Sequence, residues 1–201
     1  MERHGATDPT EHLGREHAEL LHVFRLLEGI VGDVEAGRAV PRERLALVVD
    51  YLILFGDLRH HDKEESLLVP VLVWHGFDWF EGPLARMRRD HRQERYLIRV
   101  LAELADRDRP WSSEDSRRLV GTGREFIAFM RAHLKLENEE ILAPARTRLS
   151  PEAQAHLLSA FEHFDEEHER ATDYVALRAR LEPLLAEHAE DPGSPRHGHD
   201  R

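Results

Sequence analysis

The stretch LRHHDKEESLLVP, Leu58 to Pro70, contains two adjacent histidines, each followed four residues later by a glutamate. His60 is paired in this way with Glu64, and His61 with Glu65. Residues four apart in an α-helix lie on the same face, so each pair can chelate a metal ion. The stretch therefore predicts a helix with a metal-binding face, but by itself it leaves open which pair points inward.

The same pattern returns later in the chain, where HLKLE places His133 four residues before Glu137. A further histidine precedes each copy at nearly the same interval. His17 lies 43 residues before His60, and His91 lies 42 residues before His133. This repetition predicts a site that is built twice, by four helices that each contribute one imidazole.

Apolar residues recur at helical spacing along most of the chain, and proline and glycine mark the breaks. Charged residues make up 33% of the sequence and aromatic residues only 7%, which favours an all-α protein over a strand-rich one. The predicted helices span about residues 11–37, 41–76, 78–106, 113–144 and 150–187.

Helices joined by short connections fold most simply as neighbours that alternate in direction. We therefore expect an antiparallel up-down-up-down four-helix bundle with one additional helix. The predicted divisions are the bundle over residues 10–149, a C-terminal helix packed on it over 150–188, and a flexible tail over 189–201.

The register of the HHDKEE helix decides which histidine enters the bundle. Helical steps back from His60 meet apolar residues, whereas steps back from His61 meet Asp57 and a second acid. We predict that His60 and Glu64 point inward, and that His61 and Glu65 support the site or lie at the surface. A modest rotation of the helix would exchange the two pairs.

Several imidazoles and carboxylates inside a bundle are costly to bury unless cations lie between them. The chain has no cysteine, so a metal site must use imidazole and carboxylate, which suits iron, with manganese or zinc as alternatives. Two oxo- or hydroxo-bridged ions would each keep about one open position for a small ligand. The predicted metal ligands are His17, His60, Glu64, His91, His133 and Glu137.

Charge and hydropathy narrow the class of partner. The formal net charge is −11, which disfavours binding to nucleic acid or to an anionic membrane surface. Neither a secretory signal region nor an apolar run of membrane-spanning length is present, so we expect a cytoplasmic protein. The expected partner is a small diatomic molecule or peroxide.

The lone histidines, HHDKEESLLVP and HLKLENEEILAP together resemble the hemerythrin-like, or HHE cation-binding, family of diiron four-helix bundles. The resemblance covers about residues 11–149. It implies that the four histidines bind iron and that Glu64 and Glu137 bridge the ions. In oxygen-carrying hemerythrins a further histidine follows four residues after the one that corresponds to His91. Here that place holds Arg95, which implies two nearly equivalent halves and argues against reversible oxygen carriage.

The sequence leaves the activity open. The protein is expected to bind or react with dioxygen, nitric oxide or peroxide, and alternatives are an enzyme that consumes peroxide or nitric oxide and an iron-dependent sensor or interaction module. His12 and the acidic run that begins at Asp165 are expected to be solvated. His163 and His168 are further candidates for a late ligand or a proton path.

Overall fold

The structure, a computed structural model, describes residues 7–189, which are helical with no strand. The all-α prediction is therefore confirmed for this part of the chain. The elements, in chain order, are α1 (Pro9–Glu35), α2 (Arg42–Tyr51), η1 (Leu52–His61), η2 (Glu64–Leu68), α3 (Val69–Trp74), α4 (Gly82–Ala105), α5 (Ser113–Leu136), η3 (Glu137–Leu142), α6 (Ala143–Arg148), α7 (Pro151–Ala171) and α8 (Tyr174–Ala189).

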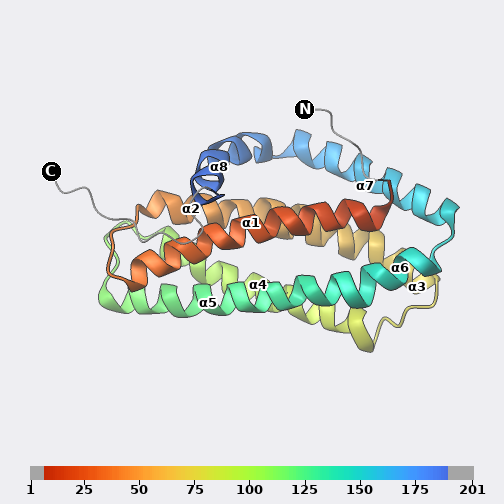
Figure 1. Cartoon of the computed structure of the whole chain (residues 1–201), viewed down its shortest axis with the longest axis horizontal. Helices are drawn as coiled ribbons and strands as arrows, with labels where there is room; N and C mark the ends of the chain where they lie inside the picture. The colour runs from red at the N-terminus through yellow and green to blue at the C-terminus, as the bar shows by residue number, and fades with distance from the viewer. Residues whose placement is uncertain (1–6, 190–201) are drawn as a thin grey trace.

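Four long segments lie side by side and form the body of the molecule (Figure 1). Two are the single helices α1 and α4. The other two are composite: η1, η2 and α3 continue α2, and η3 and α6 continue α5. Contacts join α1 to α5, α5 to α4, α4 to α2, and α2 back to α1, so the four segments surround a common interior.

The η segments are π-helical turns, in which hydrogen bonds link residues five apart and widen the helix. Two of them end just before a proline, Pro70 after η2 and Pro144 after η3. Proline has no N–H group, and its ring clashes with the carbonyl four residues earlier in an α-helix. The sequence predicted that the fourth helix ends near residue 144, but just before Pro144 the chain forms a π turn and stays helical to Arg148.

The predicted single C-terminal helix is instead two helices, α7 and α8. The chain becomes extended at Thr172, whose hydroxyl donates a hydrogen bond to the His168 carbonyl oxygen at 2.9 Å. This bond satisfies the end of α7, and the chain restarts as α8. Both helices lie along one side of the bundle (Figure 1), where α7 contacts α1 and η2, and α8 contacts α1 and α2. The predicted tail, from residue 190 on, lies outside the described residues.

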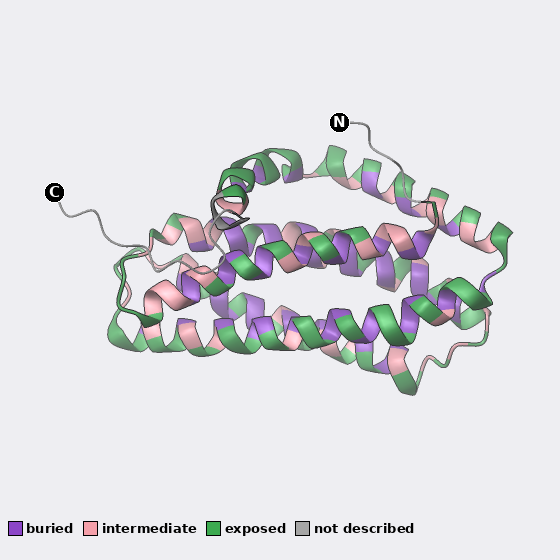
Figure 2. Ribbon diagram, viewed as in Figure 1, coloured by how far each residue is buried: buried purple, intermediate pink, exposed green. Residues whose placement is uncertain are grey.

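Two apolar clusters fill the interior on either side of a polar layer. Figure 2 shows the buried residues in purple along the helices of the bundle. On α1, Leu13 belongs to one cluster, His17 is a buried polar residue, and Leu20 belongs to the other cluster. On α4 the order Met87, His91, Leu97 repeats this arrangement. The histidine layer therefore lies at matched heights on different segments, with apolar packing on both sides that excludes water.

The contact between α1 and α5 offers a test of the packing. A Cβ atom at Gly123 would lie 2.5 Å from Val31 Cγ2, whereas one at Gly121 would meet nothing within 4 Å. We expect Gly123→Ala to lower the free energy of unfolding by about 1–3 kcal/mol. Gly121→Ala should instead raise it by about 0.5–1 kcal/mol, because alanine favours the helix. Urea denaturation measures both, and equal effects of the two variants would contradict the close α1–α5 contact.

Candidate metal centre

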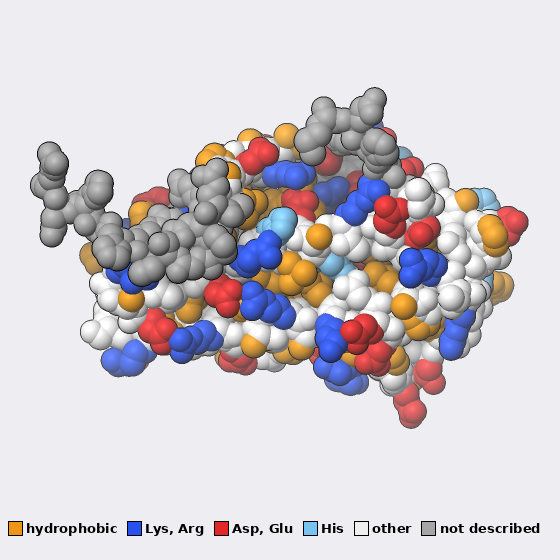
Figure 3. Space-filling view, viewed as in Figure 1, with side chains coloured by type: hydrophobic (Ala, Val, Ile, Leu, Met, Phe, Trp, Pro, Cys, Tyr) orange, Lys and Arg blue, Asp and Glu red, His pale blue; other side chains and the backbone are white. Residues whose placement is uncertain are grey.

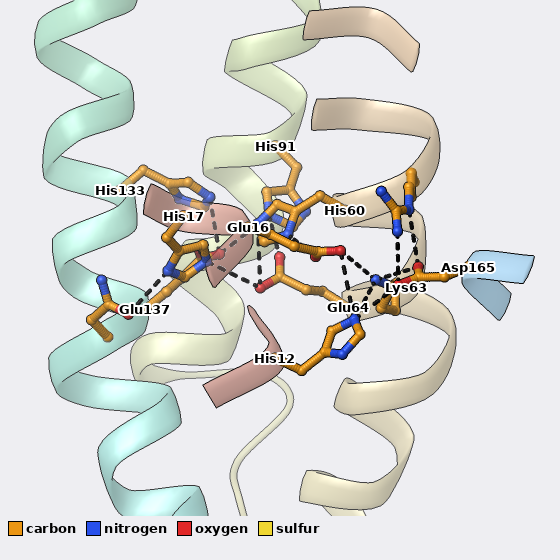
Figure 4. A network of polar contacts seen from close by, with 12 residues as sticks. His12, Glu16, His17, His60, Lys63, Glu64, His91, His133, Glu137 and Asp165 are labelled. Carbon is orange, nitrogen blue, oxygen red and sulfur yellow. Dashed lines mark hydrogen bonds and ion pairs between the residues drawn. The ribbon is translucent and has the colours of Figure 1, made fainter. Parts of the chain in front are cut away.

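The structure brings all six predicted ligand side chains together in the polar layer (Figure 4). Every one of them is at most 2% exposed. They come from six elements of the four long segments: His17 from α1, His60 from η1, Glu64 from η2, His91 from α4, His133 from α5 and Glu137 from η3.

Each carboxylate reaches two sides of the site. Glu64 Oε1 lies 3.8 Å from His60 Nε2 and 4.0 Å from His17 Nε2, while its Oε2 lies 3.5 Å from His91 Nε2. Glu137 Oε2 lies 3.3 Å from His17 Nε2, while its Oε1 lies 2.9 Å from His133 Nε2 and 3.5 Å from His91 Nε2. This arrangement suits carboxylates that bridge two ions.

A seventh side chain, that of His61, also enters the site, and of the two predicted positions for it, supporting the site or lying at the surface, the surface position is wrong. His61 is fully buried. Its ring stacks on that of His91 with centroids 3.9 Å apart and planes 15° from parallel. Ligand atoms of His61, His91 and His133 all lie within 4.8 Å of one another.

The error came from assuming α-helical spacing through this segment. Four residues before His61 stands Asp57, which suggested an outward row. Because η1 is π-helical, each of its turns holds more than four residues, and its buried positions come as adjacent pairs, Phe55 with Gly56 and His60 with His61. A search for adjacent pairs of inward residues, repeated every four to five positions, would have indicated that both histidines can face the interior.

The candidate ligands consequently form two unequal groups. One contains three histidines, His61, His91 and His133, and the other contains His17 and His60 with both glutamates. The expectation of two nearly equivalent halves, drawn from the arginine on α4, is therefore not met.

Arg95 occupies the position at which oxygen-carrying hemerythrins have a histidine, and its guanidinium pairs with two carboxylates. Its guanidinium lies 2.6 Å from Asp57 Oδ1 and 3.1 Å from Glu65 Oε1. Glu65 in turn lies 2.7 Å from His91 Nδ1. Glu65 therefore does support the site, but as the partner of His91 and not of His61.

Three imidazoles, those of His17, His60 and His91, have a hydrogen-bond acceptor at the outer nitrogen, Nδ1. For the other two, His61 and His133, a carboxylate lies near Nδ1 without a hydrogen bond. The partners lie at 3.0 Å for Asn138 and His17, 2.9 Å for Glu16 and His60, 2.8 Å for Glu94 and His61, 2.7 Å for Glu65 and His91, and 3.6 Å for Asp90 and His133. An acceptor at Nδ1 favours the tautomer with a free Nε2, and such partners orient histidine ligands in metal sites.

The inner atoms of the site are left without hydrogen bonds. Among the described residues, Nε2 of all five histidines and both oxygens of Glu64 and Glu137 are buried and have no hydrogen-bond partner. Buried polar atoms without partners are costly, several kcal/mol for a charged group. Cations placed between these nitrogens and oxygens would satisfy them all, so the donor set fits a metal centre.

The pKa values of two buried histidines and one buried glutamate also indicate that the polar layer favours positive charge. Burial, the largest single effect, lowers the pKa of His61, but the Glu94 and Asp57 carboxylates together raise it to about 10. Burial also lowers the pKa of His133, and the Glu137 and Asp90 carboxylates together raise it to about 10. Although burial would raise the pKa of Glu137, His133 holds it well below its usual value. Metal ions bound here would displace protons from these imidazoles.

The other histidine candidates lie away from the site. His163 is exposed and pairs with Glu167 at 3.4 Å on the same helix. His168 stacks on Phe164 with ring centroids 6.4 Å apart. Neither joins the described groups of residues that could hold a metal ion. In contrast, His12 and Asp165 were expected to be solvated, and they lie in a partly buried cluster behind His60.

The comparisons with known proteins agree with this geometry. The sequence profile described as the Hemerythrin HHE cation binding domain matches residues 8–145. No curated protein and no solved structure gives a significant match. None of the helices in residues 7–189 combines the length and the apolar character needed to cross a membrane. The match spans more than half of the chain and contains all seven candidate ligands, so the chain belongs to the hemerythrin HHE cation-binding domain family.

Proposed function

We propose that this protein holds two iron ions joined by an oxo or hydroxo bridge and uses them to bind or react with dioxygen, nitric oxide or peroxide. The observation that carries the proposal is the inward convergence of five Nε2 atoms and four carboxylate oxygens, all buried and without hydrogen-bond partners. Imidazole and carboxylate donors suit iron, and manganese or zinc are the alternatives. Iron would supply the redox chemistry and an open position for the small molecule.

The two unequal groups of ligands suggest which residues bind each ion. His61, His91 and His133 would hold one ion, His17 and His60 the other, and Glu64 and Glu137 would bridge them. With one oxygen bridge, this set leaves about one open octahedral position, on the ion held by two histidines. Because His61 supplies a fifth imidazole, Arg95 no longer argues against dioxygen as the ligand.

The four segments that carry these residues fall in the matched range, apart from the end of α6. We propose that residues 10–149 are the metal-binding unit, with its segments alternating up and down, and that residues 150–188 are an addition packed on it. Acidic and basic side chains are interspersed on the face shown in Figure 3. Together with the net charge of −11, this supports a small molecule, and not nucleic acid or a membrane, as the partner.

Metal analysis with visible spectroscopy tests the proposal. Purified protein loaded with Fe²⁺ without oxygen is expected to contain about two irons per chain. Its spectrum should change on exposure to oxygen, peroxide or nitric oxide. A stoichiometric change without continued consumption indicates a binder, and sustained consumption of peroxide or nitric oxide indicates an enzyme. A protein that takes up no iron, manganese or zinc would contradict the proposal.

A further inference from the structure

A buried lysine lies directly behind the metal centre. The side chain of Lys63 is fully buried, between Glu16 on α1 and Asp165 on α7. Its Nζ lies 2.6 Å from Glu16 Oε1, 2.5 Å from Asp165 Oδ1 and 3.2 Å from His12 Nε2 (Figure 4). Glu16, Asp165 and His12 converge as they would around a cation, and the lysine ammonium occupies that position.

Glu16 connects this cluster to the metal centre. One of its oxygens, Oε1, accepts a hydrogen bond from the Lys63 ammonium. The other, Oε2, lies 2.9 Å from His60 Nδ1. The two contacts together determine the orientation of the carboxylate, which is 6% exposed. Because the acceptor at Nδ1 orients the imidazole, the position of His60 Nε2 depends on where Lys63 holds Glu16.

Asp165 in turn holds Lys63 in place. Its carboxylate also accepts from Arg59, at 3.0 Å from Nε and 2.9 Å from a terminal nitrogen, and lies 2.9 Å from His12 Nε2. Glu16 and Asp165 thus balance the charges of Lys63 and Arg59 in a partly buried region. Without the Asp165 charge, two cations would compete for Glu16 and draw it away from His60.

We propose that Asp165 is a positioning residue for the metal centre, which acts through Lys63 and Glu16 on the orientation of His60. Asp165 lies on α7, beyond residue 145, where the family match ends. The segment added to the metal-binding unit therefore sets how firmly the ion beside His60 is held. The inference rests on the proposed function, because it requires that His60 binds a metal ion.

The test is the release of iron from Asp165→Asn. Protein loaded with Fe²⁺ without oxygen is mixed with excess chelator, and release is followed by absorbance. We expect one of the two ions to leave about 10-fold faster than in the unaltered protein. This is the lower end of the roughly 10–100-fold loss of metal affinity that follows removal of a direct outer partner of a ligand, because Asp165 acts through Lys63 and Glu16. The other ion, held by His61, His91 and His133, should leave at the unaltered rate.

Two control variants separate positioning from helix packing. Glu166→Gln alters the next residue of α7, an exposed side chain that pairs with Arg170, and should leave both rates unchanged. Leu157→Ala removes a buried contact of α7 but keeps Asp165. With Co²⁺ in place of iron, Asp165→Asn should shift the visible bands that report coordination, and Leu157→Ala should not.

The outcomes are distinct for the two proposals. Unaltered protein that binds two ions, with the same release rates in Asp165→Asn, would overturn the positioning role and leave the metal centre intact. The positioning role would also be overturned if Asp165→Asn and Leu157→Ala accelerated iron release equally and gave the same Co²⁺ spectra, since α7 would then act by packing alone. Unaltered protein that binds no metal would overturn both.

Discussion

Replacing His61 with alanine is expected to reduce the bound iron from about two ions per chain to about one. The fully buried ring of His61 stacks on His91, and its Nε2 has no hydrogen-bond partner. Loss of this imidazole leaves two histidines in the group that had three. Metal analysis after gel filtration measures the change.

His60→Ala should cause a loss of the same size, because His60 belongs to the other group of ligands. His163→Ala is the matched control, since that histidine is exposed and distant from the site, and it should keep both ions. If His61→Ala retains full iron while His60→Ala loses it, His61 only supports the site, as the α-helical spacing had first suggested.

Metal removal is expected to lower the melting temperature by a large amount. Without cations, Glu64 and Glu137 have oxygens buried with no hydrogen-bond partner. At a free metal concentration about 1,000 times the dissociation constant, binding stabilises the fold by about 4 kcal/mol. In a chain of this length that corresponds to a shift of about 8–16 °C. Calorimetry with and without Fe²⁺, in the absence of oxygen, gives the value.

The double variant Glu64→Gln and Glu137→Gln is the control for this experiment. Glutamine keeps the shape of each side chain but removes the negative charge that attracts the ions. Its melting temperature should not respond to Fe²⁺. If Fe²⁺ raised the melting temperature of the double variant as much as that of the unaltered protein, the metal would bind elsewhere. That result would contradict the bridging role of the two carboxylates.

The helices and four of the inward histidines could be predicted from the sequence because their signals are local. Along α1 and α4, His17 and His91 share a row with apolar residues at α-helical spacing, and both are buried. The repeated His-x3-Glu pattern added the two carboxylates. In each case, side chains within two turns of one helix carried the information.

The sequence did not predict that His61 is buried, because the segment that carries it, η1, is a π-helix and not an α-helix. The residues of η1 have ordinary helical propensity, and nothing local distinguishes a π turn from an α turn there. The widened turn is recognisable only once the buried positions are seen to come in adjacent pairs, Phe55 with Gly56 and His60 with His61. The break at Thr172 is a second case in which a helical pattern did not reveal where the helix ends.

Spacing along single helices was enough to predict the helices, the repeated pattern of imidazoles and carboxylates, and from these the class of metal site. The position of His61 beside the predicted ligands, and the contact of Asp165 with Lys63 behind His60, became visible only in the folded molecule. These contacts join residues whose separation along the chain carries no periodic signal. They form because burial in a shared interior requires each charged group to find a partner of opposite charge.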